Sequence, residues 1–168
     1  TFVLARYTAS GALDATFGTG GKVLSYPWPG SFVDARAVAI QPDGKIVVAG
    51  VADTSNTWDD FALARYNANG SLDTTFGSGG KVITAVASLA NGSTGSSADD
   101  GATALAIQPD GKIVAAGYAH GYGLFRSEDR FAVVRYTSAG ALDASFDGDG
   151  IVITPVGGGT CQAAAVAI

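Results

Sequence analysis

Cysteine, methionine and histidine are almost missing from this chain. Its 168 residues include one cysteine, one histidine and no methionine. A single cysteine, Cys161, excludes a disulfide framework within the chain and a metal–thiolate cluster. A nucleophile–histidine–acid site needs a Ser or Cys and a carboxylate placed around a histidine, and nothing in the sequence positions Ser127 or Cys161 beside His120. We therefore expect no catalytic residues, no enzyme activity and no cofactor.

Basic residues and long apolar runs are also scarce. Ten Lys and Arg against 15 Asp and Glu give a net charge of −5, so a nucleic-acid partner is not expected. No apolar run approaches the roughly 18 residues of a membrane span. The chain starts at Thr1 without a charged and apolar leader, so we expect any secretion signal to be removed or to lie upstream. Few lysines and many Ser, Thr, Gly and Asn residues suit a secreted bacterial surface protein.

Glycine, by contrast, is abundant, and the 24 glycines recur at fixed offsets within an internal repeat. Three signatures return at intervals of 59 to 70 residues. The first signature occupies Phe2–Tyr7, Phe61–Tyr66 and Phe131–Tyr136, the second Leu13–Val23, Leu72–Val82 and Leu142–Val152, and the third Ala37–Gly50 and Ala104–Gly117, reopening at Ala165–Ile168. A repeat of this length indicates one supersecondary unit used several times.

The local pattern within each unit predicts β-strands. Gln41–Lys45 reads Gln-Pro-Asp-Gly-Lys, in which Pro presets the first corner of a turn and Gly supplies a left-handed residue. This turn joins two short apolar runs and so predicts a hairpin. Phe61–Tyr66 predicts a third strand packed on both faces, and Lys81–Thr84 a fourth. No window of helical length shows an apolar stripe at helical spacing, and four strands per unit are typical of a propeller blade.

These signatures resemble the delta-60 repeat family of bacterial β-propellers and, more distantly, propeller repeats of the NHL type. The resemblance covers essentially the whole chain and rests on Ala-Ile-Gln-Pro-Asp-Gly-Lys-Ile-Val and Leu-Asp-x-x-Phe-Gly-x-Gly-Gly-Lys-Val. It implies an extracellular or cell-envelope setting, often within longer proteins, and no assigned activity. The third copy departs from the pattern, because Asp147-Gly-Asp-Gly-Ile151 replaces Gly-x-Gly-Gly-Lys.

We expect an all-β propeller of four-stranded antiparallel blades, present as an incomplete arc of two full blades with partial blades at both ends. The predicted limits are 1–34 for a partial blade, 35–101 and 102–161 for full blades, and 162–168 for the first strand of a further blade. A closed ring needs at least about four blades, and this arc has fewer. The apolar blade faces at the two ends of the arc are therefore expected to be covered by something else. Further blades of the same longer chain are the favoured partner, and neighbouring copies are the alternative.

The connections that differ between copies are expected to gather on one face of the propeller. They run over 24–34, 53–60, 85–101 and 119–129 and hold most of the irregularly placed aromatics. The predicted binding residues are Tyr26, Trp28, Phe32, Trp58, Asp59, Asp60, Tyr122, Phe125 and Arg126, and a glycan or a protein is the expected ligand. Alternatively, long loops bury their own aromatics, and burial of Trp28 and Trp58 would favour that interpretation.

Three further patterns favour structural roles. The segment Gly18–Lys22 fails the phosphate-loop spacing because Val follows the Lys, which favours a Gly-rich turn. Asp143, Asp147 and Asp149 are the candidate ligands for calcium, but calcium takes six to eight oxygens, so a simple turn is favoured and no metal is expected. An Arg in the third strand and an Asp shortly after it recur in every copy, and we predict that Arg65 and Asp73 form a structural pair.

The sequence therefore favours a noncatalytic extracellular scaffold that binds or adheres through its variable loops. The alternative from a different class is a purely structural or assembly unit of a large surface protein or fibre. A hydrolase or lyase with its site in absent blades is the third hypothesis. It requires His, Asp or Glu near the propeller axis, where the inner strands read Ala-Val-Ala-Ile.

Overall fold

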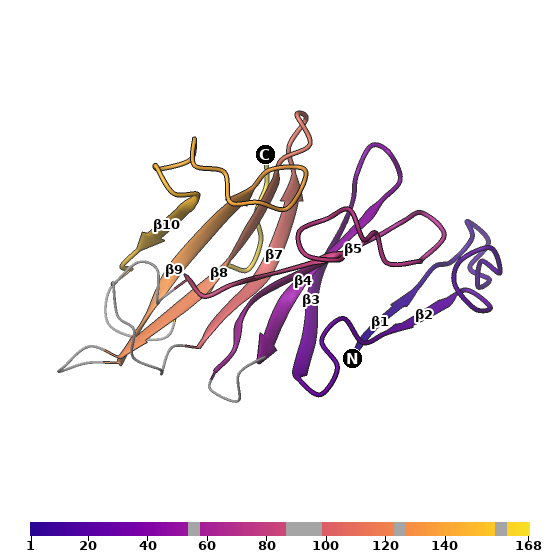
Figure 1. Cartoon of the computed structure of the whole chain (residues 1–168), viewed down its shortest axis with the longest axis horizontal. Helices are drawn as coiled ribbons and strands as arrows, with labels where there is room; N and C mark the ends of the chain where they lie inside the picture. The colour runs from indigo at the N-terminus through magenta and orange to yellow at the C-terminus, as the bar shows by residue number, and fades with distance from the viewer. Residues whose placement is uncertain (54–57, 87–98, 123–126, 157–160) are drawn as a thin grey trace.

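The structure is a computed structural model of the whole chain, and it describes residues 1–53, 58–86, 99–122, 127–156 and 161–168. These residues form ten β-strands in three antiparallel sheets (Figure 1). The strands are β1 (Phe2–Ala5), β2 (Lys22–Ser25), β3 (Phe32–Ile40), β4 (Ile46–Asp53), β5 (Asp60–Tyr66), β6 (Lys81–Thr84), β7 (Asp100–Ile107), β8 (Ile113–Tyr122), β9 (Ser127–Tyr136) and β10 (Ile151–Thr154). The described ranges contain no apolar helix of membrane-spanning length.

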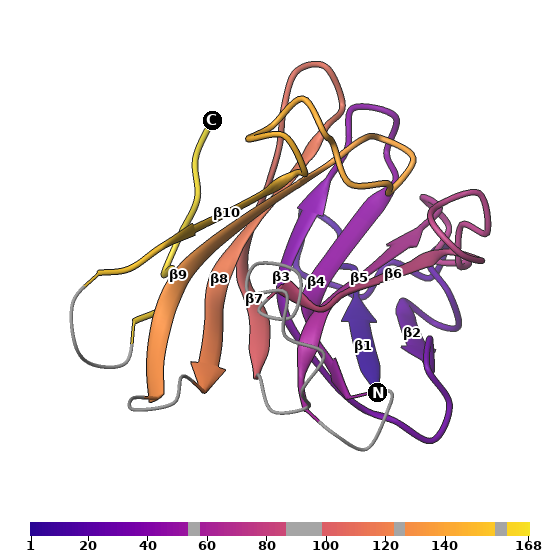
Figure 2. The same cartoon turned by 60° about the vertical axis from the view of Figure 1, so that its left-hand side comes forward.

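The sheets confirm the predicted architecture. Strands β3 to β6 form one four-stranded sheet in chain order, β7 to β10 form a second one, and β1 pairs only with β2 in a two-stranded sheet. The three sheets fan out side by side with their faces stacked (Figures 1 and 2). The described chain is therefore an incomplete propeller arc with two complete blades and the outer half of a blade before them.

The predicted corner between the first two strands of a blade forms twice. In the first full blade the amide of Gln41 donates to the carbonyl of Lys45 at 2.8 Å, and Gly44 has a φ of +81°. The Asp43 carboxylate accepts the Lys45 amide at 3.1 Å. Residues Gln108–Lys112 repeat this arrangement. The corner thus has the backbone geometry that Pro, Asp and Gly favour at these positions.

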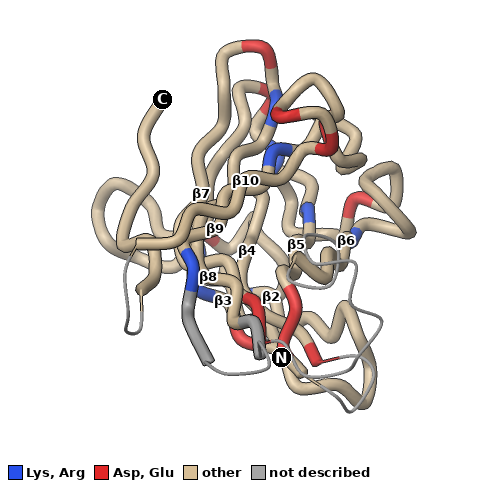
Figure 3. The backbone as a smooth tube through the Cα atoms, turned by 90° about the vertical axis from the view of Figure 1, so that its left-hand side faces the viewer, with Lys and Arg blue, Asp and Glu red and all other residues tan. Residues whose placement is uncertain are grey.

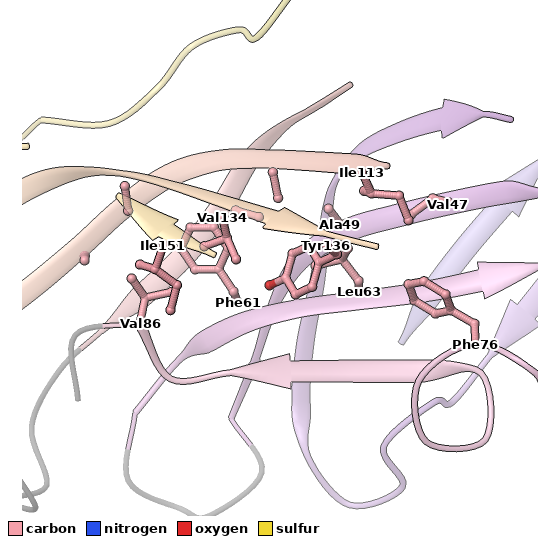
Figure 4. Packing of buried hydrophobic residues seen from close by; sticks show 14 residues of the cluster. Val47, Ala49, Phe61, Leu63, Phe76, Val86, Ile113, Val134, Tyr136 and Ile151 are labelled. Atoms are coloured by element: carbon pink, nitrogen blue, oxygen red, sulfur yellow. The ribbon is translucent and has the colours of Figure 1, made fainter. Parts of the chain in front are cut away.

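The largest core lies between the two four-stranded sheets (Figure 4). Val47 and Leu63 of the first sheet and Ile113 and Val134 of the second are fully buried in one cluster. Side chains at alternate positions of a strand point to the same face, so the neighbouring residues of β4 and β5 pack instead against β1, in a second cluster around Phe2 and Phe17. Each complete sheet therefore buries apolar side chains on both faces, and this burial is the main stabilising contribution.

The C-terminal segment 161–168 lies against the last sheet but forms no strand. Ala163 is buried with Ala104 and Ala116, and its amide donates to the carbonyl of Gly117 at 3.3 Å. By repeat position Ala163 corresponds to Ala102, which is buried against the preceding sheet in the same way. The segment lies where a first strand is expected, but among the described residues it has no neighbouring strand with which to form a ladder.

Candidate functional site

The two ends of the sheets differ in what they carry. At one end, the turn end, lie the corners Gln41–Lys45 and Gln108–Lys112 and the turns that lead from β5 to β6 and from β9 to β10. The opposite end, the loop end, is where β2 stops and β3 begins, and where β4 stops and β5 begins (Figure 2). Acidic residues occur at both ends (Figure 3). The predicted binding residues that the structure describes belong to the loop end.

An aromatic and acidic patch occupies the loop end of the first full blade. Phe32 pairs with Asp53 across β3 and β4, and Asp60 pairs with Ala52 across β5 and β4, so three strand ends meet there. Phe32 is 62% exposed and Trp58 is 36% exposed. We call Phe32, Asp53, Trp58, Asp59, Asp60 and Asp99 the loop-end patch.

Hydrogen bonds donated by two backbone amides join the patch to the next blade. The amide of Asp59 donates to the Asp99 carboxylate at 3.3 Å, and the amide of Asp100 donates to the Asp59 carbonyl at 2.6 Å. Arg36 lies nearby, where its guanidinium donates to Asp34 and to the Tyr118 hydroxyl, both at 3.1 Å. The patch therefore rests on elements of two blades that are fixed relative to each other.

Two carboxylates of the patch, those of Asp59 and Asp60, lie in an environment that disfavours their charge. Burial raises the pKa of Asp60 to about 6, and the neighbouring carboxylates of Asp53 and Asp59 add to this rise. Burial and the Asp99 carboxylate also raise the pKa of Asp59, although Arg36 opposes the change. Near pH 7 the patch is therefore anionic, and a ligand that donates hydrogen bonds or carries positive charge would relieve the repulsion.

Neutralising Asp60 is expected to stabilise the protein in a pH-dependent way. A carboxyl whose folded-state pKa is raised binds more protons in the folded state, so stability falls as pH rises from about 4 to about 6. Because Asp60 is only half-buried, solvent screening reduces the effect. Asp60→Asn should therefore raise the free energy of unfolding by about 1 kcal/mol at pH 7 and by almost nothing at pH 4. Urea denaturation at both pH values measures this difference, and an equal gain at the two values would contradict the assignment.

The other predicted aromatics behave differently from one another. Tyr26 is exposed between β2 and β3, as a binding residue needs to be. Trp28 is partly buried and packs in a T-shaped arrangement with Phe2, at a centroid distance of 6.0 Å. The Lys81 ammonium lies 5.8 Å from the Trp28 ring centroid and also donates to the Pro27 carbonyl. Trp28 therefore packs between blades, as the alternative interpretation of the loops expects, whereas Tyr26 does not.

Several predicted loop residues lie on strands. Phe32, Asp60 and Tyr122 belong to β3, β5 and β8, and His120, which was expected in a loop, also lies on β8. The prediction is wrong here because apolar periodicity marks only the buried part of a strand, whereas pairing continues into polar residues at its end. Phe125 and Arg126 lie outside the described residues, as does the side chain of Tyr122.

Two of the three candidate calcium ligands serve other contacts. Asp143 accepts hydrogen bonds from Arg135 and Ser145, and Asp149 accepts the Ile151 amide at 2.8 Å. Asp147 adopts a φ of +51°, the left-handed conformation that glycine has at the same place in the other copies. Within the described ranges, no three or more His, Cys, Asp or Glu residues are grouped so as to hold a metal ion.

The predicted pair between Arg65 and Asp73 is confirmed, and it extends further than predicted. The Nε of Arg65 lies 2.7 Å from the Asp73 carboxylate, and both side chains are buried. The guanidinium stacks over Phe76 at 4.6 Å and donates through Nη1 to the Ser138 carbonyl of the next blade at 2.6 Å. The amide of Gly77 also donates to the next blade, to the Ala139 carbonyl at 2.8 Å.

Each blade carries one such Arg–Asp–Phe set. The sets are Arg6, Asp14 and Phe17; Arg65, Asp73 and Phe76; and Arg135, Asp143 and Phe146, with Arg–Asp distances of 2.8, 2.7 and 2.7 Å. The first set also reaches the following blade, through the Ala68 and Asn69 carbonyls. The third set makes no such contact with another described blade. The first two sets therefore tie their blades to the blade that follows.

A comparison with protein-family models agrees with this geometry. The chain matches the family described as a domain of unknown function (DUF5122) β-propeller over residues 1–17, 41–76 and 108–146, which is more than half of its length. Each matched stretch ends at or near the Phe of one Arg–Asp–Phe set. No curated protein matches the chain, and the resemblance to delta-60 repeats stays a prediction. The chain belongs to this family of β-propeller domains.

Proposed function

We propose that the chain is a noncatalytic scaffold of an extracellular protein and binds a glycan through the loop-end patch. The observation that carries the proposal is the exposure of Phe32 and Trp58 beside carboxylates at the ends of paired strands. An aromatic ring offers an apolar face on which a sugar ring can stack, and a carboxylate accepts hydrogen bonds from hydroxyl or ammonium groups. Phe32 and Asp60 lie at strand ends, which position side chains more rigidly than a loop does.

A glycan array with uncharged sugars and amino sugars tests this proposal. The unaltered protein should bind at least one glycan, and Phe32→Ala or Trp58→Ala should weaken binding at least tenfold. Tyr7→Ala is the matched control, because Tyr7 is an aromatic residue that is 63% exposed near the turn end. Absence of binding to every glycan would contradict the proposal, as would equal losses in Tyr7→Ala and Trp58→Ala. If the ligand is a protein and not a glycan, no glycan on the array will bind.

A second candidate function is that of an assembly unit within a larger surface protein or fibre. The specific observation in its favour is the face of the first full blade that is turned toward β1. There, Val38 and Ile40 of β3 are 64% and 70% exposed. Large apolar side chains exposed next to one another on a sheet indicate a contact surface. Sedimentation velocity over a concentration series would show whether this face mediates self-association, since Val38→Asp would then favour the monomer.

A further inference from the structure

Two residues that break the internal repeat meet at the junction between the two full blades. By repeat position Arg36 of β3 corresponds to Thr103 of β7, and Tyr118 of β8 corresponds to Val51 of β4. Most other positions of these strands carry the same or a similar residue in both blades. Residues that recur in every blade serve the fold, whereas a departure confined to one junction indicates a local function.

Arg36 crosses this junction from the bulge in β3. Its guanidinium donates through Nε to the Asp34 carboxylate and through Nη1 to the Tyr118 hydroxyl, both at 3.1 Å, and lies 5.7 Å from the centroid of the Tyr118 ring. A Cβ at Gly101 would lie 2.9 Å from Nη1 of Arg36 and 2.9 Å from Cε1 of Tyr118. The contact between the blades therefore depends on a glycine at the position that Asp34 occupies in the first blade.

This contact lies beside the loop-end patch and acts on it. Phe32 and Asp34 occupy alternate positions of β3, so their side chains point to the same face. Burial and the Asp99 carboxylate raise the pKa of Asp59, and the charge of Arg36 opposes this rise. The other charged groups near Asp59 are the carboxylates of Asp34, Asp53 and Asp60. Arg36 therefore favours the ionised form of a carboxyl group that its neighbours disfavour.

We propose that Arg36 is the positioning residue of the loop-end patch: it fixes the second blade against the first and keeps the Asp59 carboxylate charged, as the acceptor of a hydrogen bond from the ligand. The proposal rests on the glycan binding proposed above and assigns the acceptor within that site. Arg36 itself does not contact the ligand, because Asp34 and Tyr118 already bind its guanidinium. Its removal should therefore change the pH dependence of binding.

Two variants of Arg36 test the proposal through pH. In Arg36→Gln the Asp59 carboxyl should titrate at higher pH than in the unaltered protein, as followed by the ¹³C chemical shift of that carboxyl group. A glycan that binds the unaltered protein should bind Arg36→Gln about fivefold more weakly at pH 5 and about equally at pH 8, since Asp59 is ionised in both proteins at pH 8. Arg36→Lys keeps the charge and should recover most of the binding at pH 5.

Lys22→Gln is the matched control for net charge. Lys22 is an exposed cation at the start of β2, near the turn end, so its replacement should leave both the Asp59 titration and glycan binding unchanged. Arg36→Gln should remain folded, because the Asp34 side chain is 51% exposed and an ion pair with so exposed a carboxylate contributes little stability.

The proposal and the glycan function on which it rests fail in different ways. If the unaltered protein binds a glycan but Arg36→Gln does not change the Asp59 titration, the role of Arg36 is overturned and glycan binding stands. Equal weakening at pH 5 and pH 8 would also overturn it, since Arg36 would then contact the ligand directly or serve only the fold. If the unaltered protein binds no glycan, the proposed function is wrong and Asp59 is not its acceptor.

Discussion

Replacing Arg65 by Ala is expected to lower the free energy of unfolding by about 3 kcal/mol. The substitution removes the charged partner of buried Asp73, the hydrogen bond to Ser138 in the next blade and the stacking over Phe76. Lys45, at 3.0 Å, is then the remaining cation beside Asp73. Urea denaturation followed by circular dichroism measures the loss, and Arg65→Lys should recover only part of it because an ammonium cannot form the same planar fork.

Arg135 provides a matched control from within the chain. It forms the same ion pair and the same ring contact, at 2.7 and 4.6 Å, but bonds to no further blade among the described residues. Its side chain is also more exposed than that of Arg65. Arg135→Ala should therefore cost about half as much as Arg65→Ala. Equal losses would mean that the contact between blades contributes nothing.

The effect of Arg65→Ala should also depend on pH. Burial alone would raise the pKa of Asp73, but hydrogen bonds from Thr75 and Lys45 and the charge of Arg65 hold it well below its usual range. A lowered folded-state pKa stabilises the protein above the ordinary Asp value of about 4, and this contribution fades as pH falls through lower values. The difference in free energy of unfolding between the unaltered protein and Arg65→Ala should accordingly become smaller as the pH falls below about 4.

Gly50→Ala is expected to destabilise the protein by about 3 kcal/mol, at the upper end for inserting one methyl group into a packed core. A Cβ at Gly50 would lie 1.9 Å from the Asp34 carbonyl oxygen, beside the bulge between Ala35 and Ala37. Since the contact is with backbone rather than with a mobile side chain, β3 and β4 would have to separate there. The measurement is again the urea midpoint at constant slope.

Gly79→Ala separates this clash from backbone strain. Gly79 has a φ of +63°, and a Cβ there would meet nothing within 4 Å. Only the left-handed conformation then opposes alanine, at about 1 kcal/mol. A loss as large as that of Gly50→Ala would show that the close approach of β3 and β4 is not the cause.

The repeat made the architecture predictable from sequence. Phe61–Tyr66 was expected to be buried on both faces, and it is. The Arg65–Asp73 pair was predictable because both residues recur once per unit at a fixed spacing. The reach of Arg65 to Ser138 was not predictable, since it depends on how far one blade is rotated from the next. The stacking of Arg65 on Phe76 could have been predicted, because a Phe recurs three residues after the Asp in every copy.

The loop end was less predictable. Nothing in the local sequence distinguishes Trp28, which packs against Phe2, from Trp58, which is partly exposed. Asp53 and Asp99 are absent from the predicted set although they lie in the variable connections 53–60 and 85–101, because the sequence alone does not show that these two connections meet. Strand pairing and the contact between blades bring them to Asp59 and Asp60.

The stacking of blades is tested most directly by methyl nuclear Overhauser effects between Val47 of β4 and Ile113 of β8. Both side chains are fully buried and point toward each other from different sheets (Figure 4). A protein labelled at Ile, Leu and Val methyl groups should show a cross-peak between these two residues. If cross-peaks appear within each sheet but none joins Val47 to Ile113, the sheets do not cover one another and the account is contradicted.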